Sequence, residues 1–142
     1  MRVVVDTNVL VGAMLTPHGP GAVIIGLCLA RTLTPLVDDR LIDEYEEVLK
    51  RPEFDFESAE VQRILERLKR NSLAITAAPL PGGLKGLPDL DDAAFLEVAF
   101  SGRAEAIITA NIRHFPEHRR HGIAVVTPMV FVQQFLQVRK PR

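Results

Sequence analysis

The sequence predicts an α/β fold in which helices cover both faces of a parallel β-sheet. Two observations support this: short β-prone runs alternate with helical patterns along the chain, and no internal repeat or low-complexity tract interrupts them. At 142 residues, the chain suits one domain over residues 1–142, which would bury roughly 70% of the surface that its unfolded form exposes.

The first elements in the chain are a strand and two helices. Arg2–Val5 is a β-prone run that stops at Asp6, and Val9–Leu15 resumes an apolar pattern that suits a short helix. Proline and glycine make residues 16–21 a loop. The apolar segment Ala22–Ala30 is then expected to form a buried helix.

A second strand and two amphipathic helices are expected next. Leu33–Val37 is the strand, and Pro35 limits it to an edge or a strand start. Residues 40–50 form a helix, and its apolar stripe consists of Leu41, Tyr45, Val48 and Leu49. Glu44 lies at the margin of this stripe, so it is expected at the edge of the core. Ser58 can cap the following helix.

Three more strands are expected in the second half, at Leu73–Ala77, Ala106–Thr109 and Ile123–Thr127. Residues 79–88 are rich in proline and glycine and are expected to form the longest loop. The remaining helices are Ala93–Phe100, with Gly102 as its stop, and Met129–Val138, with Pro128 in its first turn.

The composition excludes a disordered or fibrous protein, because 47% of the residues are hydrophobic and 25% are charged. The formal net charge of −1 does not by itself indicate a nucleic-acid binder. Basic side chains nevertheless gather in the last thirty residues, at Arg113, His114, His118, Arg119, Arg120, His121, Arg139, Lys140 and Arg142. They form either a solvated surface or a surface that contacts phosphate.

The cellular setting is predicted from one cysteine and the N-terminus. Cys28 is the single cysteine, so no internal disulfide can form, which favours a reducing environment. The first apolar run is too short for a signal peptide, and no run approaches the roughly 18 apolar residues of a membrane span. We therefore expect a cytoplasmic protein that does not enter a membrane.

Four polar residues are expected on one rim of the sheet. Asp6 ends the first strand, Glu44 lies on the helix after the second, Asp92 opens the helix after the third, and Asn111 follows the fourth. Carboxylates gathered there repel each other by about 3 kcal/mol per pair at roughly 5 Å and an effective dielectric near 20. Oxygen ligands without cysteine or histidine suit Mg²⁺ or Mn²⁺, which can activate water to attack a phosphodiester.

Each acid also has a simpler explanation. Asp6 could form an Asx-turn at the end of its strand, and Glu44 could be a solvated helix residue. One of Asp89, Asp91 and Asp92 can cap the next helix. Only one can do so, however, and three acids exceed what capping needs.

Further residues are candidates for supporting roles. Thr7 and Asn8 could hold the site by hydrogen bonds or continue the turn, and Thr109 could orient water or substrate or end its strand. Arg113 follows the rim and could clamp a phosphate. Pro116 argues against a helical metal site formed by His114, His118 and His121. The last helix could pack on the sheet or form a homodimer through its apolar residues Val130, Phe131, Val132, Phe135 and Leu136.

The sequence resembles the PIN-domain family in four segments that occur in the family's order, at residues 3–10, 44–49, 89–96 and 108–115. The resemblance implies an α/β/α sandwich and a ribonuclease that depends on Mg²⁺ or Mn²⁺, often the toxin of a toxin–antitoxin pair. It implies that Asp6, Glu44 and Asp92 bind metal and support hydrolysis, with Asp91 or Asp89 as auxiliaries. An RNA substrate and an antitoxin partner follow from the resemblance alone.

One departure from the family pattern is Asn111, where many members have aspartate. Asparagine offers an oxygen but no charge, so the number of ions, one or two, stays open. Two other functions remain as alternatives: a non-catalytic RNA-binding scaffold, and a phospho-acceptor domain suggested by Asp38 and Asp39 after a strand. The latter also needs an aspartate at the end of a later strand and a nearby lysine, and residues 108–111 supply neither.

Overall fold

The computed structural model describes residues 1–139, with side chains through residue 135. Its centre is a five-stranded sheet in the order β3-β2-β1-β4-β5, and every pair of neighbouring strands is parallel. In chain order the strands are β1 (Arg2–Val5), β2 (Thr34–Val37), β3 (Leu73–Ala74), β4 (Ala106–Ile108) and β5 (Ala124–Val126). The predicted parallel sheet is therefore confirmed.

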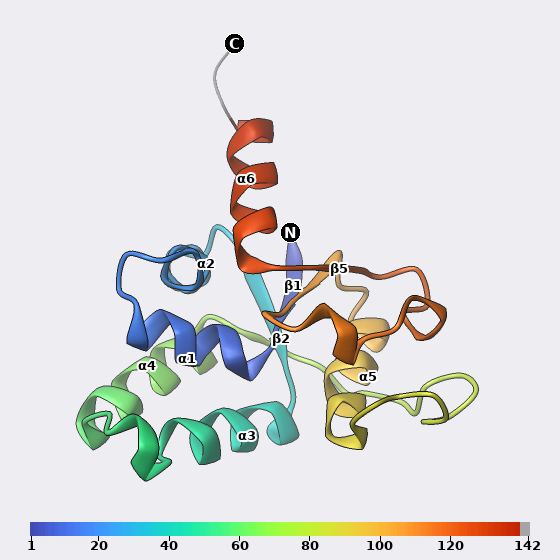
Figure 1. Ribbon diagram of the computed structural model, residues 1–142, viewed down its shortest axis with the longest axis horizontal. Helices are drawn as coiled ribbons and strands as arrows, with labels where there is room; N and C mark the ends of the chain where they lie inside the picture. The colour runs from blue at the N-terminus through green and yellow to red at the C-terminus, as the bar shows by residue number, and fades with distance from the viewer. Residues whose placement is uncertain (140–142) are drawn as a thin grey trace.

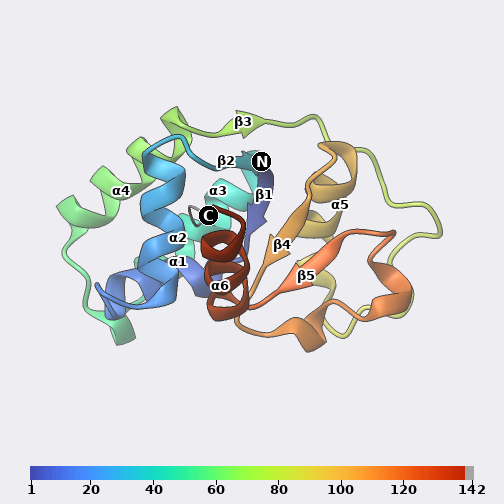
Figure 2. The ribbon, with the colours of Figure 1, turned by 90° about the horizontal axis from the view of Figure 1, so that it is seen from above.

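Helices lie on both sides of this sheet. They are α1 (Thr7–Leu15), α2 (Pro20–Leu29), α3 (Asp39–Leu49), α4 (Ser58–Arg70), α5 (Ala93–Ser101) and α6 (Pro128–Arg139). α5 packs against β1, β2 and β4, while α1, α2 and α4 lie on the opposite side of these strands (Figure 2). α6 packs against α2 and extends away from the rest of the fold (Figure 1). This arrangement confirms the predicted α/β/α sandwich.

The central strand β1 fixes the position of the rim residues. Val3, Val4 and Val5 are buried between β2 and β4, and Val5 is in register with Ile108. The backbone N–H of Asp6 then donates to the carbonyl of Ile108, with an N···O distance of 2.9 Å. The carboxyl ends of β1 and β4 consequently lie side by side.

Several boundaries differ from the predicted ones because of local capping. α1 begins at Thr7 rather than at Val9, because the carboxylate of Asp6 accepts a hydrogen bond from the Thr7 N–H and caps the helix. α2 begins at Pro20, two residues early, because proline is well tolerated in the first turn. Ser58 is the first residue of α4 rather than its cap.

Two strands also differ from expectation. β3 has only two residues instead of five, and both are exposed at the edge of the sheet. β2 is an interior strand in which Pro35 is the second residue, so the strand-start alternative is correct and the edge alternative is wrong. The predicted roles of Leu136, Arg139, Lys140 and Arg142 lie outside the described side chains.

In the described part of the chain, no single helix is long and apolar enough to cross a membrane, and α1 and α2 reach that length and composition only as a pair bent by 107°.

Replacing Gly102 with alanine is expected to destabilise the fold by about 1–2 kcal/mol, through overpacking. A Cβ atom at this buried position would lie 2.6 Å from Cδ1 of Leu36 and 3.0 Å from Cδ1 of Ile75. The matched control is Gly12→Ala in α1, where a Cβ meets nothing within 4 Å and helix propensity predicts a gain of about 0.5–1 kcal/mol. Urea unfolding of both variants measures the difference, and equal stabilities would contradict it.

Candidate metal centre

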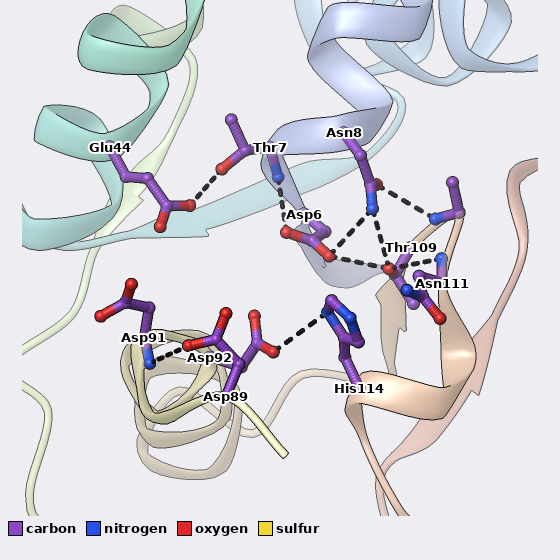
Figure 3. A network of polar contacts seen from close by, with 11 residues as sticks. Asp6, Thr7, Asn8, Glu44, Asp89, Asp91, Asp92, Thr109, Asn111 and His114 are labelled. Atoms are coloured by element: carbon purple, nitrogen blue, oxygen red, sulfur yellow. Dashed lines mark hydrogen bonds and ion pairs between the residues drawn. The ribbon is translucent and has the colours of Figure 1, made fainter. Parts of the chain in front are cut away.

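The rim of the sheet forms a cleft of about 360 Å³, which we call the acidic cleft. Its lining residues are Asp6, Thr7, Asn8, Val11, Glu44, Val48, Arg51, Phe54, Asp89, Asp91, Asp92 and His114. Side chains from β1, α3, the turn before α5 and the segment after β4 face each other there (Figure 3). The structure therefore brings three of the four predicted rim residues, Asp6, Glu44 and Asp92, into one cleft.

Asp6 is held at the carboxyl end of β1 by both of its carboxylate oxygens. One oxygen caps α1 by accepting from the N–H of Thr7 at 2.8 Å. The other accepts from Oγ1 of Thr109 at 2.7 Å and from Nδ2 of Asn8 at 3.3 Å (Figure 3). Burial raises the pKa of Asp6, and these hydrogen bonds partly offset the rise. Asp6 can therefore cap α1 with one carboxylate oxygen while the other oxygen is held by Thr109 and Asn8.

Asn8 and Thr109 connect the start of α1 to the segment after β4. Oδ1 of Asn8 accepts from the N–H of Ala110 at 3.0 Å, and Oγ1 of Thr109 accepts from the N–H of Asn111 at 3.0 Å. Both side chains also donate hydrogen bonds to the carboxylate of Asp6, and their supporting roles in a site stay a prediction. Asn111 itself is exposed, and its side chain is not part of the lining of the acidic cleft.

Glu44 reaches the acidic cleft from α3. Its Oε2 accepts a hydrogen bond from Oγ1 of Thr7, and partial burial raises its pKa. The neighbouring Tyr45 fixes α3 against the sheet, because its buried hydroxyl donates to the carbonyl of Val5 at 2.6 Å. Glu44 is therefore partly buried and turned toward the start of α1.

The three acids before α5 have different environments. Asp89 caps the short 3₁₀ helix η2 (Leu90–Asp92) by accepting from the N–H of Asp91 at 2.9 Å. Asp91 is exposed, whereas Asp92 is only 7% exposed and makes no capping hydrogen bond to α5. Desolvation and the nearby Asp6 raise the pKa of Asp92 to about 7. Among these acids, Asp92 is the one whose carboxylate is buried without a capping role.

His114 is the lining residue that sequence reasoning assigned elsewhere. It belongs to the 3₁₀ helix η3 (Ile112–His114), and its Nδ1 lies 3.2 Å from Oδ2 of Asp92. The other candidate histidines have separate surroundings: His118 is exposed, and the ring of His121 packs edge-on against Phe100. No sequence signal links His114 to Asp92, because η3 and η2, which carry them, meet only in the folded chain.

The basic residues around the acidic cleft also differ from expectation. Arg113 is exposed and does not line the cleft, so it is available for contacts only from outside. Arg51 and Phe54, which the sequence did not single out, do line it. The guanidinium of Arg51 is bound to the carboxylate of Glu47 at 2.9 Å, one helical turn away.

The donor set suits a hard divalent cation. Carboxylates from three elements face the acidic cleft, and burial raises the pKa of each. Oδ2 of Asp92 is buried and has no hydrogen-bond partner. Within the described side chains, no three acids, cysteines or histidines lie close enough to hold an ion as they stand. The residues fit an ion that draws them together, because a cation would relieve both the repulsion and the lost hydration.

Comparison with known proteins identifies the family. The PIN domain family matches residues 2–113. The chain belongs to the PIN-domain family. A chain in the crystal structure of VapBC2 from Rickettsia felis bound to a DNA fragment from their promoter has a similar fold, with 16% sequence identity and a TM-score of 0.57. The similarity covers 89% of this chain and 98% of that chain. No curated protein matches the sequence.

Replacing Thr109 with valine in this PIN domain is expected to cost about 1–3 kcal/mol of stability. The valine side chain has the same shape but leaves Oδ2 of Asp6 and the N–H of Asn111 without the Thr109 hydroxyl. Thr109→Ser is the control, because serine keeps the hydroxyl and removes one methyl group from a fully buried site. Urea unfolding should rank valine below serine, and the reverse order would show that the hydroxyl does not stabilise the fold.

Proposed function

We propose that this PIN domain is an endoribonuclease that uses Mg²⁺ or Mn²⁺, held by Asp6, Glu44 and Asp92, with Asp91 at the rim. The observation that carries the proposal is the burial of Asp92 opposite Asp6 in the acidic cleft, with Oδ2 lacking a hydrogen-bond partner. Such an arrangement is unfavourable for ionised carboxylates unless a cation compensates them. A divalent ion bound in the cleft would supply that compensation.

The chain's own residues have separate tasks in this proposal. Thr109 and Asn8 hold Asp6 in one orientation, and Thr7 does the same for Glu44. The carboxylates bind the ion, which when bound supplies a Lewis acid for the phosphodiester and lowers the pKa of water. Arg113, exposed beside the cleft, contacts the RNA backbone. Asn111 adds no charge and does not line the acidic cleft, so its task in this proposal is to help place the RNA.

The proposal extends to the biological setting. Membership of the PIN-domain family supports a role as the toxin of a toxin–antitoxin pair, with an antitoxin as partner. The similarity of fold to a chain of VapBC2 is consistent with this setting. A cytoplasmic location agrees with Cys28, a free and buried thiol. Pairing of two chains through α6, on which Met129 and Val130 are exposed, stays a prediction.

Cleavage of end-labelled RNA tests the proposed activity. The protein is incubated with Mn²⁺, with Mg²⁺ and with EDTA, and a DNA of the same sequence serves as the comparison substrate. We expect internal cleavage of RNA that requires the ion and is restored when EDTA is saturated with Mn²⁺. Full activity in EDTA would contradict the proposal. RNA binding without cleavage, equal with and without the ion, would instead support the non-catalytic scaffold.

A further inference from the structure

The contact between Asp92 and His114 is not a hydrogen bond. Nδ1 of His114 lies 3.2 Å from Oδ2 of Asp92, yet Oδ2 has no hydrogen-bond partner. The ring N–H direction therefore does not point at this oxygen. The two atoms stand side by side in the acidic cleft, and an unprotonated Nδ1 has a lone pair that a cation can accept.

This spacing is the one that adjacent ligands adopt on a small divalent cation. With bonds of roughly 2.1 Å at right angles, two donor atoms are about 3 Å apart. Asp92 is the least exposed of the three acids before α5, at 7%, so its unpartnered oxygen is a buried donor rather than a surface one. The pair is thus already spaced as two neighbouring ligands of one ion.

The other donors approach from the opposite wall of the acidic cleft. Asp6 lines the same cleft as both members of the pair, and its charge raises the pKa of Asp92. Glu44 lines the same cleft from α3 (Figure 3). Asn111, three residues before His114, is exposed and supplies no charge. The segment after β4 thus contributes a nitrogen donor, His114, to the lining of the acidic cleft and contributes no carboxylate there.

We propose that His114 is a nitrogen ligand of the ion in the acidic cleft, completing a site with Asp6, Glu44 and Asp92 and favouring Mn²⁺ over Mg²⁺. The proposal rests on the metal dependence proposed above. Imidazole strengthens binding of transition-metal ions, whereas Mg²⁺ prefers oxygen ligands and retains its waters. The site of this chain would then differ from an all-oxygen site in its choice of ion.

Pulsed electron paramagnetic resonance of bound Mn²⁺ tests the proposal without measuring activity. The full chain, labelled with ¹⁵N only in histidine, is loaded with Mn²⁺ at pH 8, where an ordinary histidine is neutral. We expect the spectrum to show coupling to a histidine nitrogen. The coupling should disappear in His114→Gln and persist in His118→Gln, which is the matched control because His118 is exposed and does not line the cleft.

Calorimetric titration of the same proteins gives the second measurement. His114→Gln should weaken Mn²⁺ binding by at least about 10-fold and change Mg²⁺ binding much less, so the preference for Mn²⁺ falls. Bound Mn²⁺ without histidine coupling in the wild type, or coupling that persists in His114→Gln, would overturn this inference and leave the proposed function intact. A wild-type protein that binds neither ion would overturn the proposed function as well.

Discussion

Replacing Asp6 with asparagine is expected to reduce RNA cleavage by more than about 100-fold, since even outer partners of metal ligands cost about 10–100-fold when removed. Asparagine keeps the oxygen that caps α1 through the N–H of Thr7, so the helix should still form. What it removes is the charge with which Asp6 would hold the ion. Initial rates with saturating Mn²⁺ measure the loss, and circular dichroism checks the fold.

The matched control for Asp6→Asn is Asp43→Asn. Asp43 is an exposed carboxylate on α3 that does not line the acidic cleft, so its removal changes net charge equally without touching the site. Its cleavage rate should stay within about twofold of the wild type, as for most surface substitutions. Equal cleavage rates for the wild type and both variants would contradict the assignment of Asp6 to the metal site.

Replacing Asp92 with asparagine is expected to stabilise the metal-free protein by about 1–2 kcal/mol at pH 8, after allowing for solvent screening in the open cleft. Folding raises the pKa of Asp92 to about 7, chiefly through desolvation and then through Asp6. The folded protein therefore binds a proton there more tightly than the unfolded chain does. The stability that this group contributes is complete below pH 4 and is lost as the pH rises to about 7.

Urea unfolding between pH 4 and pH 8 measures this effect. The free energy of unfolding of Asp92→Asn should exceed that of the wild type by an amount that grows across that range. Asp91→Asn serves as the control, because Asp91 is exposed. Adding Mn²⁺ should reverse the order, because binding to the folded wild type adds about 2.7 kcal/mol at one hundred times the dissociation constant. A gain that does not vary with pH would show that Asp92 is not the group whose ionisation is unfavourable.

The sequence predicted the fold because each element has a local signal. β1 is a run of β-branched residues that ends at Asp6, and the apolar stripe of α3 includes the buried Tyr45. Alternation of such elements requires crossovers, and crossovers make the sheet parallel. Boundaries were predicted less well, since the start of α1 depends on which atom caps it. The length of β3 depends on how many of its residues pair with β2, and only Leu73 and Ala74 do so.

The acids of the candidate site could be predicted for the same reason. Asp6 follows a strand directly, so its placement on the rim needs only the direction of β1. Separating Asp92 from Asp91 and Asp89 needed the structure, because the three are adjacent in sequence and differ in burial. Burial depends on how the turn before α5 packs, which no local pattern encodes.

By itself, the sequence determined a parallel α/β sheet, the polar residues at the ends of its strands, and the absence of charge at Asn111. Only the tertiary structure decided that one oxygen of Asp6 caps α1 while the other is held by Thr109. It also decided that His114 stands beside Asp92. The physical reason is that strand and helix signals are carried by neighbours in the chain. Contacts such as that of His114 with Asp92 arise only when separate elements pack together.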